Sequence, residues 1–237
     1  MAMSELNRRR LRNFRRNSRA FWSLVIFTVL FVLSLFAELI ANDRPILISY
    51  KGEYYFPVYK FYPETAFGGD FGTEAIYTDP GVQCLIKTGG RPECWDDPEG
   101  VEREARETGT ISGQKVQPGW MLWPPIPYHY RTINNVGTAP SAPDAQHLLG
   151  TDDTARDVLA RVIYGFRLSI LFTLIVTVIG SAIGIAAGAI QGYFGGRTDL
   201  IFQRLLEIWS STPSLYVIII LFAILGRSFW LLVFVSI

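Results

Sequence analysis

The sequence contains few of the residues from which catalytic and metal-binding sites are usually built. Two histidines, His129 and His147, and two cysteines, Cys84 and Cys94, are present among 237 residues. A structural metal site usually needs about four such ligands close together, so no metal and no cofactor are expected. No side chains are spaced as a nucleophile, a base and an orienting acid would be, and each histidine is expected to be a surface or packing residue. The composition therefore argues against an enzyme.

The sequence also lacks a loop that could bind the phosphates of a nucleotide. Residues 192–196 are rich in glycine, but the Gly-Lys-Ser/Thr ending of a Walker A loop does not follow them. If ATP drives this protein, another chain must bind and hydrolyse it.

The chain as a whole carries a formal net charge of only +1, but its charged residues are unevenly distributed. Residues 1–19 hold seven arginines and one glutamate, whereas residues 42–167 hold 17 acidic and 12 basic residues. An apolar run begins directly after the arginines, which is typical of the cytoplasmic side of a membrane. We therefore expect a cytoplasmic tail rather than the alternative, a nucleic-acid-binding arm. The arginines are Arg8, Arg9, Arg10, Arg12, Arg15, Arg16 and Arg19.

Long apolar runs are the most prominent feature of the chain. A helix needs roughly 20 apolar residues to cross a bilayer, and three runs approach or exceed this length. They predict an α-helical integral membrane protein with its N-terminus in the cytoplasm. The segment 42–167 then lies outside the cytoplasm, and 191–207 forms a cytoplasmic loop. The predicted spans are 20–41, 168–190, 208–225 and the beginning of a fourth at 229–237.

The first forty residues could instead be a secretory signal peptide, which also has a basic stretch before an apolar one. The cleavage site argues against this alternative, because Leu39 stands where a small residue is needed and Glu38 lies next to it. We therefore expect an uncleaved span that ends before Pro45. Glu38 could face a transport path, but contacts at the membrane interface are the favoured explanation.

The polar segment is too long for a simple loop and predicts a domain of mixed α/β or irregular structure. Residues 46–62 are aromatic and β-prone, and Lys51-Gly52 suggests a hairpin turn. Residues 63–119 are expected to be irregular apart from a short helix at 101–107, and residues 120–130 to be extended. The aromatic side chains are expected to pack within the domain or on the membrane surface rather than to stack on a ligand.

The two cysteines lie ten residues apart in this segment. Disulfides persist outside the cytoplasm, so we expect a bridge between Cys84 and Cys94, with free thiols as the alternative. The bridge would close a small loop with a turn at Gly89-Gly90.

Helical patterns surround the second span. Residues 152–166 predict an amphipathic helix at the membrane interface, with Thr151 or Asp152 as its N-cap. Within the span, three glycines spaced four residues apart form a smooth face on which another helix can pack closely. These are Gly180, Gly184 and Gly188.

Two short signals mark breaks in the later helices. Gly195-Gly196 allows a sharp turn after the second span. Pro213 is expected to kink the third span.

Three motifs resemble those of permease subunits in the dipeptide and oligopeptide class of ABC importers. The first, HLLGTDDTARDVLARVIYG, runs from His147 to Gly165 and has Ala155 where glycine is usual. The second, GYFGGRTD, begins at Gly192, and the third combines an Arg-x-x-Glu pair with a following proline. The resemblance implies structural or gating roles for Gly150, Thr151, Asp152, Arg156, Asp157, Arg161, Gly192, Tyr193, Gly195, Gly196, Asp199, Arg204, Glu207 and Pro213.

The N-terminal part resembles a narrower group, the E-type permeases of Yej transporters, which import peptides and the peptide-nucleotide antibiotic microcin C. The similarity rests on FAELIAND at 36–43, YFP at 55–57, FGG at 67–69 and WMLWPPI at 120–126. Residues 71–115 show no specific resemblance.

The resemblance implies the transmembrane domain of a type I ABC importer permease in a bacterial inner membrane. Its expected partners are a second permease subunit, ABC ATPase subunits, a periplasmic peptide-binding protein, the peptide and the lipid bilayer. A coupling helix that docks on the ATPase is expected beyond residue 237, so the sequence is expected to be a fragment or a truncated product. The rival hypothesis is a membrane-anchored periplasmic binding or scaffold module. The glycine face and the Pro213 kink argue against it.

Overall fold

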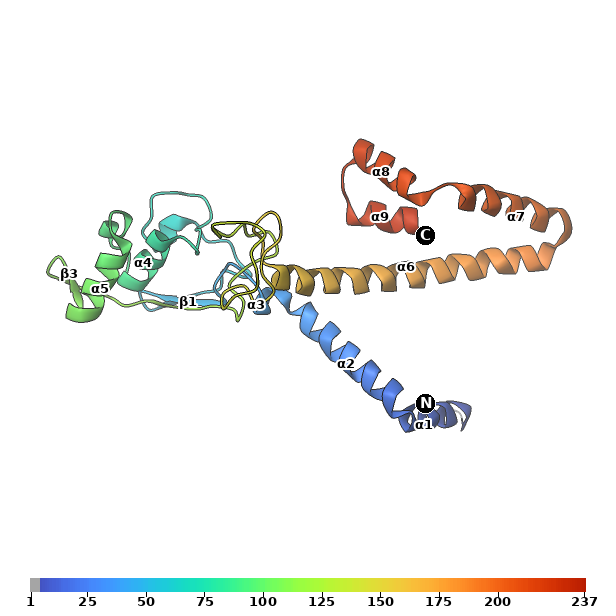
Figure 1. The fold of residues 1–237 in the computed structure, drawn as a ribbon, viewed down its shortest axis with the longest axis horizontal. Coiled ribbons are helices and arrows are strands. Elements are labelled where there is room, and N and C mark those ends of the chain that lie inside the picture. Colours follow the sequence, from blue (N-terminus) through green and yellow to red (C-terminus); the bar gives the residue numbers. More distant parts are fainter. Residues whose placement is uncertain (1–4) are drawn as a thin grey trace. The chain divides into compact units, whose positions relative to one another are not determined.

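The computed structural model describes residues 5–237 and divides into two compact units, one ending at Phe166 and the other comprising Arg167–Ile237 (Figure 1). The Arg-rich tail predicted at 1–19 therefore lies partly outside the described residues. The first unit begins with three helices, α1 (Glu5–Arg16), α2 (Ser18–Leu35) and α3 (Ala37–Ile40). The apolar run at 20–41 is thus not one helix, because it is interrupted at Phe36.

A small α/β insert, residues 42–157, follows these helices. Its sheet has the order β2-β1-β5, with antiparallel pairing on both sides of the central strand. The strands are β1 (Leu47–Tyr50), β2 (Glu53–Tyr55) and β5 (Trp120–Leu122). The predicted hairpin is confirmed: Lys51 and Gly52 both have positive φ angles, 50° and 83°, as a two-residue hairpin turn requires.

Aromatic rings fill much of the core between this sheet and the next helices. Phe67 is fully buried, and its ring meets the rings of Tyr50 and Tyr55 edge-on, with centroids 5.5 and 5.2 Å apart. Edge-on packing of this kind is favourable because the ring edge is positive and the ring face negative. The side chains of Tyr54 and Tyr59 lie outside this core and are exposed.

The middle of the insert is more helical than the sequence predicted. The expected helix at 101–107 is confirmed as α5 (Pro98–Thr108), but α4 (Pro80–Thr88) was missed. The signals for α4 are local: Asp79 caps its N-terminus, Pro80 occupies the first turn, and Gly89 ends it with φ +79°. Short elements complete this region: η1 (Glu64–Phe67), η2 (Pro92–Trp95), β3 (Thr110–Ile111) and β4 (Gln114–Lys115).

A disulfide connects α4 to η2. Cys84 and Cys94 are bonded, with Cα atoms 5.6 Å apart, and both are completely buried. They pack with Leu85, Val101 and Ile111 in a second apolar cluster of the insert. The bridge therefore lies in a core that also holds α5.

The later helices differ from the predicted boundaries. The predicted amphipathic helix at 152–166 and the span at 168–190 form one continuous helix, α6 (Val158–Phe194), which begins six residues later than expected. Nothing between residues 158 and 190 breaks the helical period, because the stretch has no proline and its charged residues are good helix formers. The predicted loop at 191–207 is also mostly helical, because α7 (Gly196–Ser211) starts after a turn at Gly195.

The predicted third span is broken at Pro213. The helices α7 and α8 (Ser214–Leu225) meet there with a bend of 74°. Proline lacks the N–H that a continuous helix needs and clashes with the preceding turn, which explains the break. A turn at Gly226 precedes α9 (Phe229–Ser236).

The helix lengths support a membrane protein. Two helices, α2 and α6, are long and apolar enough to cross a bilayer, and the bent pair α7–α8 would make a third span if it counts as one.

The disulfide predicts a simple chemical result. Full-length protein unfolded in denaturant without reductant should show no reactive thiols from Cys84 and Cys94, and two after reduction. Replacing both cysteines with serine should lower the unfolding free energy of the insert by about 2–3 kcal/mol, because the unfolded chain loses a short cross-link. Two reactive thiols before reduction would contradict the bridge. The control variant is Thr154→Ser at an exposed position, which should leave the unfolding free energy unchanged.

Candidate functional site at the start of α6

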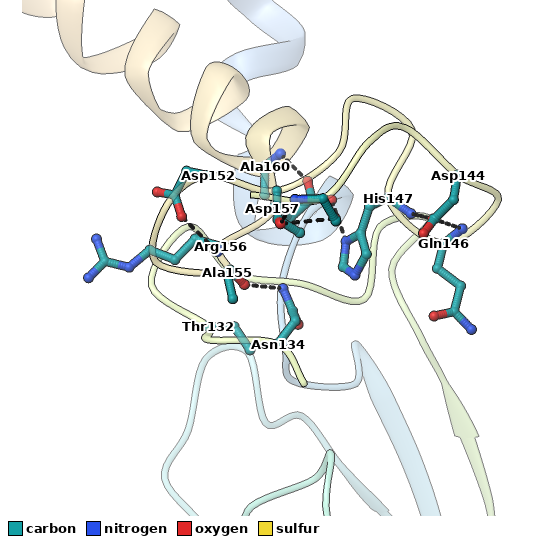
Figure 2. Close-up of polar contacts among 12 residues, drawn as sticks. Thr132, Asn134, Asp144, Gln146, His147, Asp152, Ala155, Arg156, Asp157 and Ala160 are labelled. Carbon is teal, nitrogen blue, oxygen red and sulfur yellow. Dashed lines mark hydrogen bonds and ion pairs between the residues drawn. The ribbon is translucent and has the colours of Figure 1, made fainter. Parts of the chain in front are cut away.

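The first permease-like motif forms a folded loop and the first two turns of α6. Figure 2 shows His147 and Asp157 facing each other beside the N-terminus of this helix. The loop has two residues with left-handed backbone, Gly150 and Ala155, at φ +71° and +58°. These conformations are incompatible with a helix, so the predicted N-cap at Thr151 or Asp152 is wrong.

Asp157 is the residue that caps α6. Its Oδ1 accepts a hydrogen bond from the Ala160 N–H at 2.7 Å, and its backbone carbonyl accepts one from the Arg161 N–H at 3.2 Å. A carboxylate at this position also interacts favourably with the positive end of the helix dipole. The side chain of Asp157 is almost completely buried, so its charge must be compensated by these contacts.

His147 supplies the second contact to this carboxylate. Its Nδ1 lies 2.9 Å from Asp157 Oδ2, and its side chain is 3% exposed. The imidazole stacks on Tyr128, with ring centroids 4.5 Å apart. Burial raises the pKa of the Tyr128 phenol, and the nearby carboxylates of Asp157 and Asp144 raise it further. His147 is therefore a packing residue, as the sequence analysis expected of each histidine. Its contact with Asp157 was not predicted.

Asp144 holds the His147 backbone in place. Its Oδ1 accepts hydrogen bonds from the N–H groups of His147 at 2.6 Å and Gln146 at 2.8 Å. These two bonds stabilise the carboxylate and lower the pKa of Asp144.

Asp152 organises the loop rather than the helix. Its Oδ1 accepts hydrogen bonds from the N–H groups of Thr154 and Arg156, both at 2.9 Å, and its Oδ2 pairs with Arg161 on α6. Desolvation raises the pKa of Asp152, but the Arg156 and Thr154 hydrogen bonds and the Arg161 charge outweigh it and bring the pKa to about 2. The carboxylate therefore stays ionised throughout the physiological range.

Gly150 is required by the space around it. A Cβ at this position would lie 2.3 Å from the Ser141 carbonyl oxygen, closer than two such atoms can approach. The neighbouring Thr151 accepts a hydrogen bond from the Ser141 N–H at 3.0 Å, which holds two distant parts of the loop together. Gly150 and Thr151 thus fix the path of the loop.

The first turns of α6 contact the end of the first apolar segment. The Tyr164 hydroxyl donates a hydrogen bond to the Ala41 carbonyl at 2.9 Å, and Ala160 packs with Ala37 and Ala41. Small side chains allow the backbones to approach closely here. We call these four residues, Ala37, Ala41, Ala160 and Tyr164, the span clamp. The sequence did not single out Ala160 or Tyr164, although both belong to the first motif.

The other motif residues lie in the second unit. The GYFGGRTD stretch forms the turn between α6 and α7, where Gly195 and Gly196 have φ angles of +55° and +56°. Further along α7, Arg204 and Glu207 form an exposed ion pair with an N–O distance of 2.5 Å. The first motif therefore belongs to the first unit, and the other two belong to the second.

The glycine face of α6 lies in the second unit. Among the residues that the structure describes, no atom lies within 4 Å of a Cβ added at Gly180, Gly184 or Gly188. Such a face leaves room for a helix from another chain.

The part of the chain that the structure describes contains no group of three or more His, Cys, Asp or Glu side chains that could hold a metal ion. The candidate site consists of packing and capping contacts at the start of α6.

Replacing Asp157 with alanine should destabilise the first unit by about 2–4 kcal/mol, because α6 loses its cap and buried His147 loses its partner. Thermal unfolding of the full-length protein in detergent would measure the change. Alanine at the neighbouring Asp153, which is exposed, is the matched control and should have little effect. Equal shifts for the two variants would refute the role assigned to Asp157.

Comparison with known proteins finds similar permease proteins. A family described as the N-terminal TM domain of oligopeptide transport permease C matches residues 6–57. The inner membrane ABC transporter permease protein YejE of Escherichia coli (strain K12) is 40% identical over 99% of this chain and 61% of its own length. The peptidoglycan transport system permease protein YejE of Agrobacterium fabrum is 42% identical over 97% of this chain and 59% of its own length. The oligopeptide transport system permease protein OppC of Haemophilus influenzae is 37% identical over 46% of this chain and 34% of its own length.

The chain thus spans about three fifths of the length of the two YejE relatives. The match to YejE also includes the α/β insert, whereas the OppC relative covers less than half of the chain. The resemblance inferred from the motifs is confirmed: this chain is similar to ABC transporter permease proteins, and its similarity to the YejE permeases extends over almost its entire length.

Proposed function

We propose that the chain is part of an inner-membrane permease subunit of an ATP-driven importer for peptides and forms half of its translocation path. The observation that carries this proposal is the similarity to YejE permeases across both apolar helices and the insert. The names of these relatives point to transport, and one of them specifies peptidoglycan, so peptides derived from peptidoglycan are included in the proposed substrate class. Peptide-nucleotides of the microcin C type are a further candidate substrate.

The span clamp supports a role for the first motif in this path. It joins the end of the first apolar segment to the start of α6 through a buried hydrogen bond and close alanine contacts. Two helices joined in this way would move as one body when a transporter changes between its inward-facing and outward-facing states. Gly150, Asp152 and Asp157 would act by holding the clamp, and not by touching the substrate.

The proposed complex contains a second permease, ABC ATPase subunits and a periplasmic peptide-binding protein. The glycine face at Gly180, Gly184 and Gly188 offers a surface for a helix of the second permease. The ATPases would bind and hydrolyse ATP, since this sequence has no Walker A loop. The insert would lie in the periplasm, where it would receive the binding protein or shape the outer gate.

The alternative is a membrane-anchored periplasmic binding or scaffold module without transport activity. Such a module would need a span only as an anchor. The glycine face on α6 and the bent pair α7–α8 favour the permease, because neither feature is needed for anchoring.

The proposed orientation can be tested by labelling single new cysteines with a membrane-impermeant maleimide in intact cells permeabilised only at the outer membrane. A cysteine at the exposed Glu107 in the insert should react, whereas one at Arg12 should react only after the inner membrane is opened. The arginine-rich tail and the positive-inside rule give this expectation. Labelling at Arg12 in intact cells would overturn the orientation.

The permease hypothesis predicts that the full-length protein purified in mild detergent brings ATPase subunits with it. Deleting the gene should abolish ATP-dependent uptake of labelled peptides, and restoring it should recover uptake. Asp153→Ala should support normal uptake, whereas Asp157→Ala should reduce it in proportion to the loss of folded protein. Absence of ATPase subunits together with normal uptake in the deletion strain would favour the anchored module.

A further inference from the structure

The first described helix is not explained by the transport motifs. The helix α1 holds six of the seven N-terminal arginines and is a separate element from α2 (Figure 1). The break lies at Asn17, whose backbone is extended, with φ −84° and ψ 92°. Its Oδ1 accepts a hydrogen bond from the Ala20 N–H at 3.3 Å and so caps α2. A cap at this point allows α1 to take a direction different from that of the span.

The two sides of α1 differ strongly in chemistry. With 3.6 residues per turn, Leu6, Leu11 and Phe14 share one side of the helix. Leu6 and Leu11 are 59% and 40% exposed, so this apolar side is uncovered. The opposite side carries five exposed arginines, which are Arg8, Arg9, Arg12, Arg15 and Arg16.

A helix of this kind is poorly suited to water alone. Five cations on one side repel one another, and a helix of 12 residues is marginally stable without packing. A surface that offers anions to the arginines and an apolar layer to the leucines and Phe14 would reduce the repulsion and give the helix something to pack against. The headgroup region of a bilayer that contains anionic lipid has this structure.

The position of α1 next to the first span identifies the surface. The span α2 begins two residues after α1 ends, so α1 is held at the level where this span enters the bilayer. The ring of Phe14 contacts the ring of Phe21 in the first turn of α2, with centroids 6.5 Å apart. This contact directs the apolar side of α1 toward the part of α2 that enters the membrane.

We propose that α1 lies along the membrane surface and binds anionic phospholipids. Leu6, Leu11 and Phe14 insert at the boundary between headgroups and acyl chains, and the arginines bind lipid phosphates. Arg10 lies between Leu6 and Phe14, and its long side chain reaches the phosphates from the apolar side. The inference requires α2 to cross the bilayer, but it holds whether or not the protein transports peptides.

The test uses full-length protein in nanodiscs of phosphatidylcholine with and without phosphatidylglycerol. A nitroxide label is placed on a new cysteine at Leu11 or, on the opposite side of α1, at Arg12, because the native cysteines are bonded to each other. In anionic nanodiscs, the Leu11 label should be accessible to oxygen and protected from a water-soluble nickel complex. The Arg12 label should show the reverse. This difference in accessibility between the two labels, which we call the contrast, should be smaller in pure phosphatidylcholine.

Charge variants test the role of the arginines. Each substitution of Arg8, Arg9, Arg15 or Arg16 by glutamine should lower the ratio of bound to unbound α1 by about fivefold in anionic nanodiscs. Glutamine keeps the helix propensity similar, so helix formation is not the variable. The matched control replaces Arg103 and Arg106, two exposed arginines of the insert, and should leave the contrast unchanged.

Two outcomes would overturn the proposal. Equal exposure of the Leu11 and Arg12 labels to the nickel complex in anionic nanodiscs would show that α1 is not on the membrane. Protection of Leu11 that appears only after a nucleic-acid oligonucleotide or an ATPase subunit is added, regardless of lipid charge, would assign α1 to that partner instead.

Discussion

The carboxylate of Asp157 connects the motif loop to α6, and the contacts made by the first two turns of this helix depend on it. One oxygen caps the helix at Ala160 and the other meets His147, so a buried charge has a partner on each side. Such a charge is tolerated only where its hydrogen bonds are made, because burial removes the water that would otherwise stabilise it. The cap fixes where α6 begins. It therefore also fixes the position of Ala160 and Tyr164, which lie within the first two turns of the helix.

These turns explain how a long insert can be accommodated between two apolar segments. The insert starts after Ala41 and ends at Asp157, and Tyr164 brings the two ends together through its bond to the Ala41 carbonyl. Residues just before the loop also return to this place, because the Asn42 N–H donates to the Ile126 carbonyl and the Ile126 N–H donates to the Ile40 carbonyl. When the two ends of an insertion lie close together, the inserted domain can fold without disturbing the elements on either side.

The length of α6 has a further consequence for its place in a bilayer. At about 1.5 Å per residue, its 37 residues extend over roughly 55 Å, whereas the hydrocarbon core is about 30 Å thick. A substantial part of α6 must therefore lie outside the hydrocarbon. The charged residues Arg161 and Arg167 fall in its first turns, which is the part that carries the span clamp. The clamp thus lies in the charged end of α6, which is the part least suited to the hydrocarbon.

Several features of this protein could be predicted from the sequence because their causes are local. The apolar runs, the Lys51-Gly52 turn, the Gly195-Gly196 turn and the break at Pro213 each depend on a few adjacent residues. The α4 helix had equally local signals in Asp79, Pro80 and Gly89, but its nine residues lie in a segment whose many glycines and prolines suggested irregular structure.

The start of α6 and the span clamp could not be predicted in this way. Thr151 and Asp152 are good cap residues by type, and the helix begins instead after Asp157 because Gly150 and Ala155 adopt left-handed backbone within a folded loop. Tyr164 and Ala41 are 123 residues apart, so no local pattern connects them. By itself, the sequence determined which segments are apolar, where the chain turns and which motifs resemble those of peptide permeases. Only the tertiary structure decided which residues cap and clamp α6, because a buried carboxylate or hydroxyl takes the partner that folding brings within hydrogen-bonding distance.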